Sequence, residues 1–226
     1  MQPVVEARGL YHIYRERDVE TVALRGAEIA LGAGSWTSVM GPSGSGKSTL
    51  VHVLAGLVEP SGGSVLVEGA DLTRLPPDER ALRRRTRVGV VLQRDNLHPL
   101  LDVAGNVGLT LRLDNRPVAE VRARVAELLA EVGLADRARQ PTRQLSGGEA
   151  QRIAIAAAVA ARPVVLLADE LTGELDEATT ADVLDLLETL MELEGTAILT
   201  VTHNPLVAAR ADRRLVMRDG LVVDAA

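Results

Sequence analysis

Apolar runs with the length of a strand alternate along this chain with segments of helical spacing. Val88–Leu92, Val164–Ala168 and Ala197–Thr202 are largely continuous apolar runs, and Asp176–Glu194, between the last two, has the length and spacing of a helix. Strands that read as continuous apolar runs are typical of parallel sheets buried on both faces. We therefore expect an α/β fold whose core is a mostly parallel sheet covered by helices.

Three other regions depart from this alternation. Val4–Leu31 mixes short β-prone runs with charged turns, which predicts the strands of a separate small sheet. From Asp102 to Gln140 apolar residues occur at helical spacing among Arg and Glu, most clearly in Val118–Val132, so a helical insertion is expected here. Asp219-Gly220 predicts the turn of a closing β-hairpin.

Composition narrows the classes of function. The 226 residues carry a net charge of -6, with one Trp, two Tyr and no Phe, whereas proteins that bind nucleic acid strands present basic surfaces and stacking aromatics. We therefore expect no nucleic acid partner. The absence of cysteine excludes disulfides and thiolate metal sites and agrees with a cytoplasmic location. No signal-like stretch opens the chain, and the longest apolar run, Ile153–Ala161, is too short to span a bilayer, so membrane contact is expected only through a partner.

A glycine-rich loop lies between an expected strand, Ser35–Met40, and an expected helix, Lys47–Leu57. This loop matches the pattern G-x-x-x-x-G-K-[ST] in full. Glycines let successive N–H groups turn toward phosphate oxygens, and the following helix adds its positive N-terminal end. In this pattern the lysine reaches the terminal phosphates and the last hydroxyl is a ligand for Mg²⁺. A nucleoside triphosphate site is therefore predicted at Gly41, Ser43, Gly44, Ser45, Gly46, Lys47, Ser48 and Thr49.

Polar residues follow the ends of the buried runs. Asp169 and Glu170 come directly after Val164–Ala168. Because ligands lie beyond the carboxyl ends of strands in an open parallel sheet, both acids are expected to face the phosphate loop. We expect Asp169 to hold Mg²⁺ through water and Glu170 to activate the attacking water.

Two further strand ends are expected at the same edge. His203 follows Ala197–Thr202, and Gln93 follows Val88–Leu92 and is expected to contact Mg²⁺ or the water. A single histidine is more often structural than catalytic. The convergence of several strand ends on one site is what favours a functional role for both residues.

A second anion cradle is predicted where Ser146, Gly147 and Gly148 open the expected helix Gly148–Ala161. A Ser-Gly-Gly helix start presents backbone donors to an anion, although serine at such a place is also an ordinary N-cap. One chain with one nucleotide site has little use for two cradles, whereas in a head-to-tail dimer each cradle caps the partner's nucleotide. The sequence therefore predicts a dimer.

These motifs, in this order, resemble the ABC ATPase family over essentially the whole chain. The resemblance pairs Gly41–Thr49 with Walker A, Gln93 with the Q-loop, Leu145–Glu149 with the signature motif, Val164–Glu170 with Walker B, Leu175-Asp176 with the D-loop and His203 with the switch histidine. It implies a P-loop NTPase in a single domain, in which residues 1–93 and 141–226 form the core with an antiparallel β-subdomain and about 94–140 form a helical subdomain. It also puts Tyr14 where the family stacks an aromatic ring on adenine; Tyr11 is the fallback, and core packing is the alternative for both.

Within the family the chain is most similar to the branch of lipoprotein-release, macrolide-export and FtsE-type ATPases. The strings that carry this likeness are Asn96–Pro99, Leu167–Glu170 and Val201–Pro205. Leu171 departs from the family pattern, which usually has Pro after the catalytic Glu, and Gly105 replaces a common acidic residue. Because Pro would fix φ, we expect Leu171 to loosen the hold on Glu170 and to slow hydrolysis without abolishing it.

The resemblance implies a homodimer that closes around Mg-ATP and drives a separate transmembrane permease from the inner face of the cell membrane. The expected catalytic residues are Lys47, Gln93, Glu170 and His203, and the expected metal site is formed by Ser48, Gln93 and Asp169. The alternative is an FtsE-like regulatory ATPase that transmits conformational change to a membrane protein without moving cargo. ABC proteins that act on DNA or ribosomes generally carry a long coiled-coil insertion or a second nucleotide domain, and neither occurs here.

Overall fold

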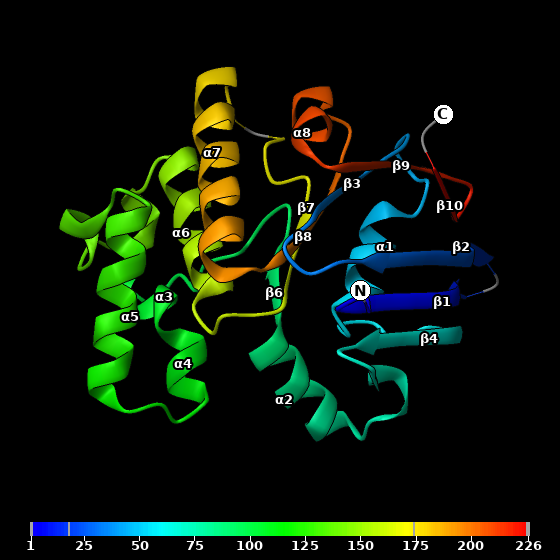
Figure 1. Ribbon diagram of the computed structural model, residues 1–226, viewed down its shortest axis with the longest axis horizontal. Helices are drawn as coiled ribbons and strands as arrows, with labels where there is room; N and C mark the ends of the chain where they lie inside the picture. The colour runs from blue at the N-terminus through cyan, green and yellow to red at the C-terminus, as the bar shows by residue number, and fades with distance from the viewer. Residues whose placement is uncertain (1, 18, 174, 225–226) are drawn as a thin grey trace.

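The computed structural model describes residues 2–17, 19–173 and 175–224, arranged as two sheets and a layer of helices (Figure 1). The strands are β1 (Val5–Glu16), β2 (Val19–Leu31), β3 (Trp36–Met40), β4 (Gly62–Val67), β5 (Ala70–Asp71), β6 (Val88–Val91), β7 (Val165–Asp169), β8 (Ala197–Thr202), β9 (Arg213–Arg218) and β10 (Leu221–Asp224). The helices are α1 (Lys47–Leu54), α2 (Pro77–Arg87), α3 (Val103–Val107), α4 (Leu109–Leu113), α5 (Val118–Glu131), α6 (Gly147–Val159), α7 (Glu177–Glu194) and α8 (Pro205–Arg210). Short 3-10 helices occupy Leu72–Arg74, Ala135–Arg137 and Thr142–Gln144.

The central sheet has the strand order β10-β9-β3-β8-β7-β6. All of its neighbouring pairs are parallel except the hairpin β9–β10. Every residue of β7 and β8 is buried, as their continuous apolar sequences predicted. The α/β fold with a mostly parallel core sheet is therefore confirmed.

The predicted small sheet at the N-terminus is also present. It is antiparallel, with the order β2-β1-β4-β5. Helix α1 lies between the two sheets, because Leu50 and Leu54 pack in one apolar cluster with Leu24 of β2 and Leu199 of β8. Burial on both sides fixes the helix that follows the glycine-rich loop. The helix was expected to extend to Leu57 but ends at Leu54. Gly56, just beyond this end, has a φ of +65°, which is outside the helical range.

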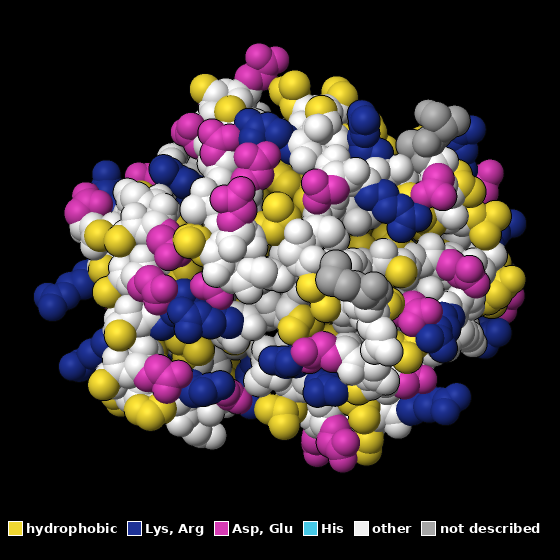
Figure 2. All heavy atoms as spheres, in the orientation of Figure 1, with side chains coloured by type: hydrophobic (Ala, Val, Ile, Leu, Met, Phe, Trp, Pro, Cys, Tyr) yellow, Lys and Arg dark blue, Asp and Glu magenta, His cyan; other side chains and the backbone are white. Residues whose placement is uncertain are grey.

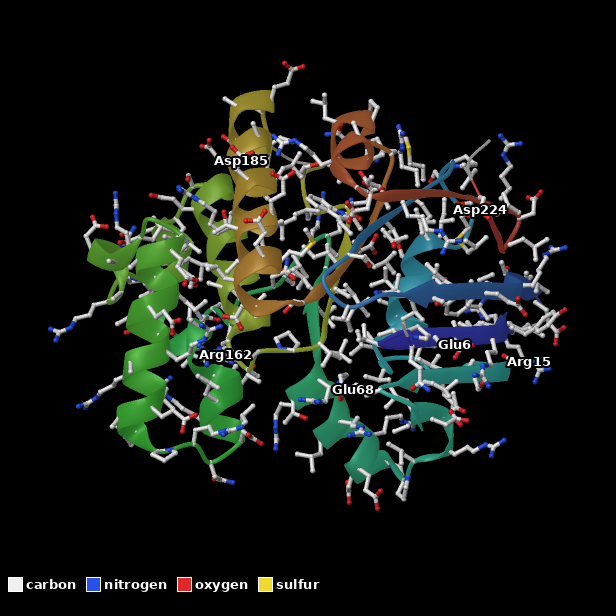
Figure 3. The ribbon with its side chains drawn as sticks, in the orientation of Figure 1. Glu6, Arg15, Glu68, Arg162, Asp185 and Asp224 are labelled. Atoms are coloured by element: carbon white, nitrogen blue, oxygen red, sulfur yellow. The ribbon has the colours of Figure 1, made fainter. Side chains whose placement is uncertain are left out.

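The expected helical insertion is formed by α3, α4 and α5, which pack against α6 and α7 (Figure 1). Buried Arg124 of α5 donates to the carbonyls of Val159 and Ala160 at the end of α6, at 3.2 and 3.3 Å. It also donates to the carboxylate of Glu194 at the end of α7, at 2.6 Å. Arg162, labelled in Figure 3, contacts the same carboxylate at 3.3 Å. These contacts tie α5 to the far ends of the two helices.

Gly105, one of the two departures from the family pattern, has a local structural reason. It lies buried in α3, where a Cβ would stand 2.8 Å from Asp102 Oδ1 and 3.1 Å from Leu101 Cβ. Asp102 caps this helix by accepting from the Gly105 N–H at 2.6 Å. An acidic side chain would therefore crowd the cap at this position.

Charged side chains of both signs are interspersed on the face that Figure 2 shows, without a continuous basic surface. Ion pairs on the surface include Arg87–Glu68, at 2.5 Å, and Arg213–Asp224, at 2.8 Å, whose acidic partners are labelled in Figure 3. Among the described residues, no helix combines the length and the apolar character needed to cross a membrane.

Candidate functional site

A cleft of about 640 Å³ opens where the glycine-rich loop meets the ends of the central strands and the wall of the small sheet. Its lining includes the following predicted site residues: Tyr14, Ser43, Gly44, Gly46, Lys47, Ser48, Thr49, Gln93, Glu170 and His203. The tertiary structure thus brings together residues from β1, the glycine-rich loop with the first turn of α1, and three strand ends. Gly41 and Ser45 belong to the same loop but do not line the cleft.

Three residues that the sequence did not indicate, Thr21, Val22 and Ala23 of β2, form part of the cleft wall. Thr21 pairs with Tyr14 across the two strands. Cross-strand pairing in the expected N-terminal sheet is the signal that could have identified them once Tyr14 was chosen.

The loop keeps its curvature through glycines at positions that exclude a side chain. Gly44 and Gly46 have φ values of +78° and +105°, a region that glycine enters readily. A Cβ on Gly46 would collide with the carbonyl of Ala23, and one on Gly41 with the carbonyl of Met217. The carbonyls of Ala23 and Met217 therefore pack closely against the backbone of the loop. Gly44 and Gly46 of the same loop line the cleft.

Lys47 places a cation at the mouth of the loop. Its Nζ donates to the carbonyls of Gly41 and Pro42, at 2.9 and 3.0 Å. Carbonyls of the loop thereby hold the ammonium group close to the backbone of the loop. An ammonium group at the N-terminal end of a helix suits the oxygens of a polyphosphate.

Asp169 is buried beside Ser48, and its Oδ1 has no hydrogen-bond partner. Burial raises the pKa of the Asp169 carboxyl, and a hydrogen bond from the Ser48 hydroxyl opposes this shift. A buried carboxylate with a free oxygen next to a hydroxyl is the kind of oxygen donor set that Mg²⁺ accepts. The residues present therefore fit the metal that the family implies.

Glu170 and His203 contact each other directly, which the sequence did not predict. Glu170 Oε2 lies 2.9 Å from His203 Nδ1 and accepts a hydrogen bond from the backbone N–H of His203 at 3.3 Å. The hydroxyl of Thr202, a residue missed in the sequence, donates to the same oxygen at 3.3 Å. The Glu170 side chain is 13% exposed and that of His203 is 71% exposed. The carboxylate is thus fixed by the end of β8, and the histidine lies at the solvent side.

The two tyrosines differ in their relation to the cleft. Tyr14 lines it, donates or accepts a hydrogen bond with Thr49 Oγ1 at 3.3 Å, and packs edge-to-face on His12 with ring centroids 4.5 Å apart. Tyr11 is exposed and is not part of the lining. Both side chains are at least 40% exposed. The alternative of core packing is therefore wrong for both, and the geometry favours Tyr14 over Tyr11.

Substitution of Tyr14 is expected to weaken ATP binding. Loss of base stacking costs about 1–3 kcal/mol per base, so Tyr14→Ala should raise the Kd for ATP about tenfold. Tyr11→Ala is the matched control and should leave the Kd within about twofold. Titration of each purified variant with ATP in a calorimeter measures this. Equal losses for both variants would contradict the choice of Tyr14.

Ser146, Gly147 and Gly148 lie outside the cleft lining in the described chain. Ser146 caps α6 in a capping box: its Oγ accepts from the Glu149 N–H at 3.3 Å, and its own N–H donates to Glu149 Oε2 at 2.8 Å. The bond from the Ser146 N–H lowers the pKa of Glu149. A Cβ on Gly148 would come within 2.5 Å of Thr179 Cγ2 on α7. Ser146 therefore has the ordinary role of an N-cap. The single chain does not bring Ser146, Gly147 and Gly148 to the cleft.

Leu171, the other departure from the family pattern, is buried in the apolar cluster formed with α6 and α7. The preceding Glu170 is held by its contacts with Thr202 and His203. Both observations argue against the loosening that the sequence suggested.

Leu171→Pro is therefore expected to lower the free energy of unfolding by about 2 kcal/mol, because part of a buried side chain is removed. Turnover should not rise by more than about twofold, since Glu170 keeps its partners. Urea denaturation and phosphate release measure the two quantities. A large gain in turnover would restore the expectation drawn from the sequence.

Comparisons with known proteins agree with this geometry. Residues 24–173 match the family model described as ABC transporter. The methionine import ATP-binding protein MetN of Thermobifida fusca is 45% identical over 98% of this chain and 69% of its own length. The lipoprotein-releasing system ATP-binding protein LolD of Rhodopseudomonas palustris (strain BisB5) is 41% identical over 98% of this chain and 96% of its own.

The solved structure of MJ0796, described as a dimeric bacterial ABC transporter cassette, superposes with a TM-score of 0.89, 36% identity and 96% coverage of both chains. A second structure of that cassette holds ADP and Pi in a post-hydrolysis state. The LolD relative agrees with the branch that the sequence indicated, and the MetN relative shows that the likeness extends beyond it. This chain belongs to the ABC transporter family, as an ATP-binding cassette with ATPase activity.

Proposed function

We propose that this chain binds Mg-ATP in the cleft and hydrolyses its γ-phosphate there to drive a membrane permease. The observation that carries the proposal is the convergence of Lys47, Gln93 and the Glu170–His203 pair on one cleft of about 640 Å³. Tyr14 would stack on the adenine at the β1 end, and the Gly44–Thr49 amides would bind the phosphates.

Different residues of the cleft would have different roles in ATP hydrolysis. Glu170 would accept the proton of the attacking water, and His203, which already donates to its carboxylate, would hold that carboxylate in place. Lys47 and the loop amides would stabilise the charge on the phosphate oxygens. Ser48 and Asp169, with Gln93, would hold Mg²⁺, which when bound neutralises phosphate charge.

Two copies of the chain would assemble head to tail. Ser146 and its glycines lie outside the cleft of their own chain, and the similar MJ0796 cassette is described as dimeric. Each α6 N-terminus would then cap the nucleotide held by the other copy, and the donors of Gly147 and Gly148 would reach its phosphates.

A groove of about 840 Å³ between α2, α4, α6 and the loop after β6 would receive the permease. Leu57 and Leu113 line this groove and are 45% and 55% exposed. Asn96 also lines the groove. Its side-chain amide accepts from the Leu92 N–H and donates to the Leu92 carbonyl, both at 2.7 Å, so the turn between Leu92 and Asn96 contains Gln93. One turn would thus connect the permease contact with the nucleotide cleft. The chain would be peripheral, at the inner face of the membrane, through this contact.

Phosphate release from Mg-ATP, measured over a range of protein concentrations, tests the proposal. Because each complete site needs two chains, activity per chain should rise with concentration until the dimer saturates. Activity that is constant per chain would contradict the dimeric site, and no hydrolysis with or without a co-purified membrane protein would contradict the ATPase. Transport by the reconstituted complex would separate cargo movement from a purely regulatory role.

A further inference from the structure

The turn of the C-terminal hairpin β9–β10 contacts the phosphate loop from outside the cleft. The Gly220 N–H donates to the carbonyl of Ser45 at 3.1 Å, and the Gly220 carbonyl accepts from the Arg25 N–H of β2 at 3.0 Å. The hairpin lies beside β2 in Figure 1, and Asp224, near its end, is labelled in Figure 3. Gly220 therefore connects the loop to the β2 strand.

The bond to Ser45 determines which way a neighbouring donor points. The Ser45 carbonyl and the Gly46 N–H belong to one planar trans peptide, so they point in opposite directions. The carbonyl points outward to the hairpin, and the Gly46 N–H therefore points away from the hairpin. Because Gly46 lines the cleft, this direction suits a donor to a phosphate oxygen.

Gly220 also links two parts of the cleft wall, the phosphate loop and strand β2. Arg25 lies two residues beyond Ala23, which lines the cleft and whose carbonyl packs against Gly46. Met217 of β9, fully buried, packs its carbonyl against Gly41. The hairpin and β2 thus enclose the outer side of the loop.

The position admits no side chain. Gly220 has a φ of +78°, and a Cβ there would stand 2.8 Å from the Ala23 carbonyl oxygen and 3.1 Å from the Arg25 nitrogen. Since the obstacles are mainly backbone atoms, a methyl group would displace the turn rather than a flexible side chain.

We propose that Gly220 is a positioning residue for the phosphate loop, which sets the affinity for the triphosphate by fixing the Ser45–Gly46 peptide. This inference rests on the proposed function of the cleft. It concerns the hairpin β9–β10, which lies outside the motifs of the family pattern.

Gly220→Ala, compared with Gly69→Ala, tests the inference. Gly69, in the turn between β4 and β5, has a φ of +77°, and a Cβ there meets nothing within 4 Å. Both variants carry the same backbone strain, but only the first is obstructed. Gly220→Ala should raise the KM for ATP and the inhibition constant of tripolyphosphate about tenfold, which corresponds to one lost hydrogen bond to a charged group. The inhibition constant of adenosine, and all constants of Gly69→Ala, should stay within about twofold.

Two results would overturn the inference: equal behaviour of the two variants, or weaker adenosine inhibition with unchanged tripolyphosphate inhibition. Thermal unfolding checks that both variants fold. If Gly220→Ala does not, insertion of one glycine between Asp219 and Gly220, with the same insertion between Glu68 and Gly69 as control, moves the donor without adding a side chain. The natural chain must hydrolyse ATP in the same assay, so failure of the proposed function is seen separately.

Discussion

Glu170→Gln is expected to lower steady-state ATP turnover by about 10²- to 10⁴-fold, because a positioned general base contributes that much to a rate. The amide keeps the size of the side chain and still accepts a hydrogen bond from His203 or Thr202, so ATP affinity should stay within about twofold. Phosphate release and calorimetric titration measure the two effects. When hydrolysis is blocked, the dimer should also accumulate in the presence of ATP, and size-exclusion chromatography would detect it.

Glu192→Gln is the matched control for this substitution. Glu192 is an exposed carboxylate on α7 outside the cleft lining, and its neutralisation should leave turnover within about twofold. If Glu170→Gln kept more than about a tenth of the natural turnover, Glu170 would not be the base. Another residue of the cleft would then have to accept the proton.

Ser146→Asp, introduced together with Glu170→Gln, is expected to abolish the ATP-dependent dimer, whereas Ser146→Asn should retain it. Asp and Asn are both good N-caps of similar size, so either should keep the start of α6 that Ser146 now caps. Only Asp adds a negative charge that faces the partner's triphosphate in the proposed assembly. Repulsion of about 1–4 kcal/mol at each of two such contacts would raise the dimer Kd by more than about tenfold.

Analytical ultracentrifugation with Mg-ATP measures the dimer, and calorimetry at low protein concentration measures ATP binding by the monomer. Because Ser146 does not line the cleft of its own chain, neither substitution should change monomer affinity. Loss of monomer affinity in Ser146→Asp would show that the cradle acts on the nucleotide of its own chain. Equal dimerisation of both variants would show that Ser146 does not lie at the dimer interface.

Local sequence patterns determined most of the architecture. The continuous apolar runs predicted β6, β7 and β8 to within one residue at each end, because strands buried on both faces have no polar alternation. The Gly41–Ser48 pattern identified the phosphate loop, since its glycines supply the backbone angles that the turn requires. The boundaries of the core at 1–93 and 141–226 and of the helical subdomain at about 94–140 stay predictions.

The choice between Tyr14 and Tyr11 depended on tertiary structure. Residues three apart on a regular strand face opposite sides, yet β1 is irregular against β2 at several points, including His12/Ile13. Both tyrosines are consequently exposed, and only Tyr14 reaches the cleft. A bulge depends on the partner strand, so the sequence of β1 alone does not show it.

The sequence by itself determined the parallel core, the phosphate loop and the set of polar strand ends, because each depends on spacing and backbone preference within a short segment. Only the tertiary structure decided that Glu170 is held by His203, that Thr21–Ala23 form a wall of the cleft, and that Gly220 binds the carbonyl of Ser45. Each of these contacts joins residues from different elements, and the packing of whole sheets and helices sets the distance between them.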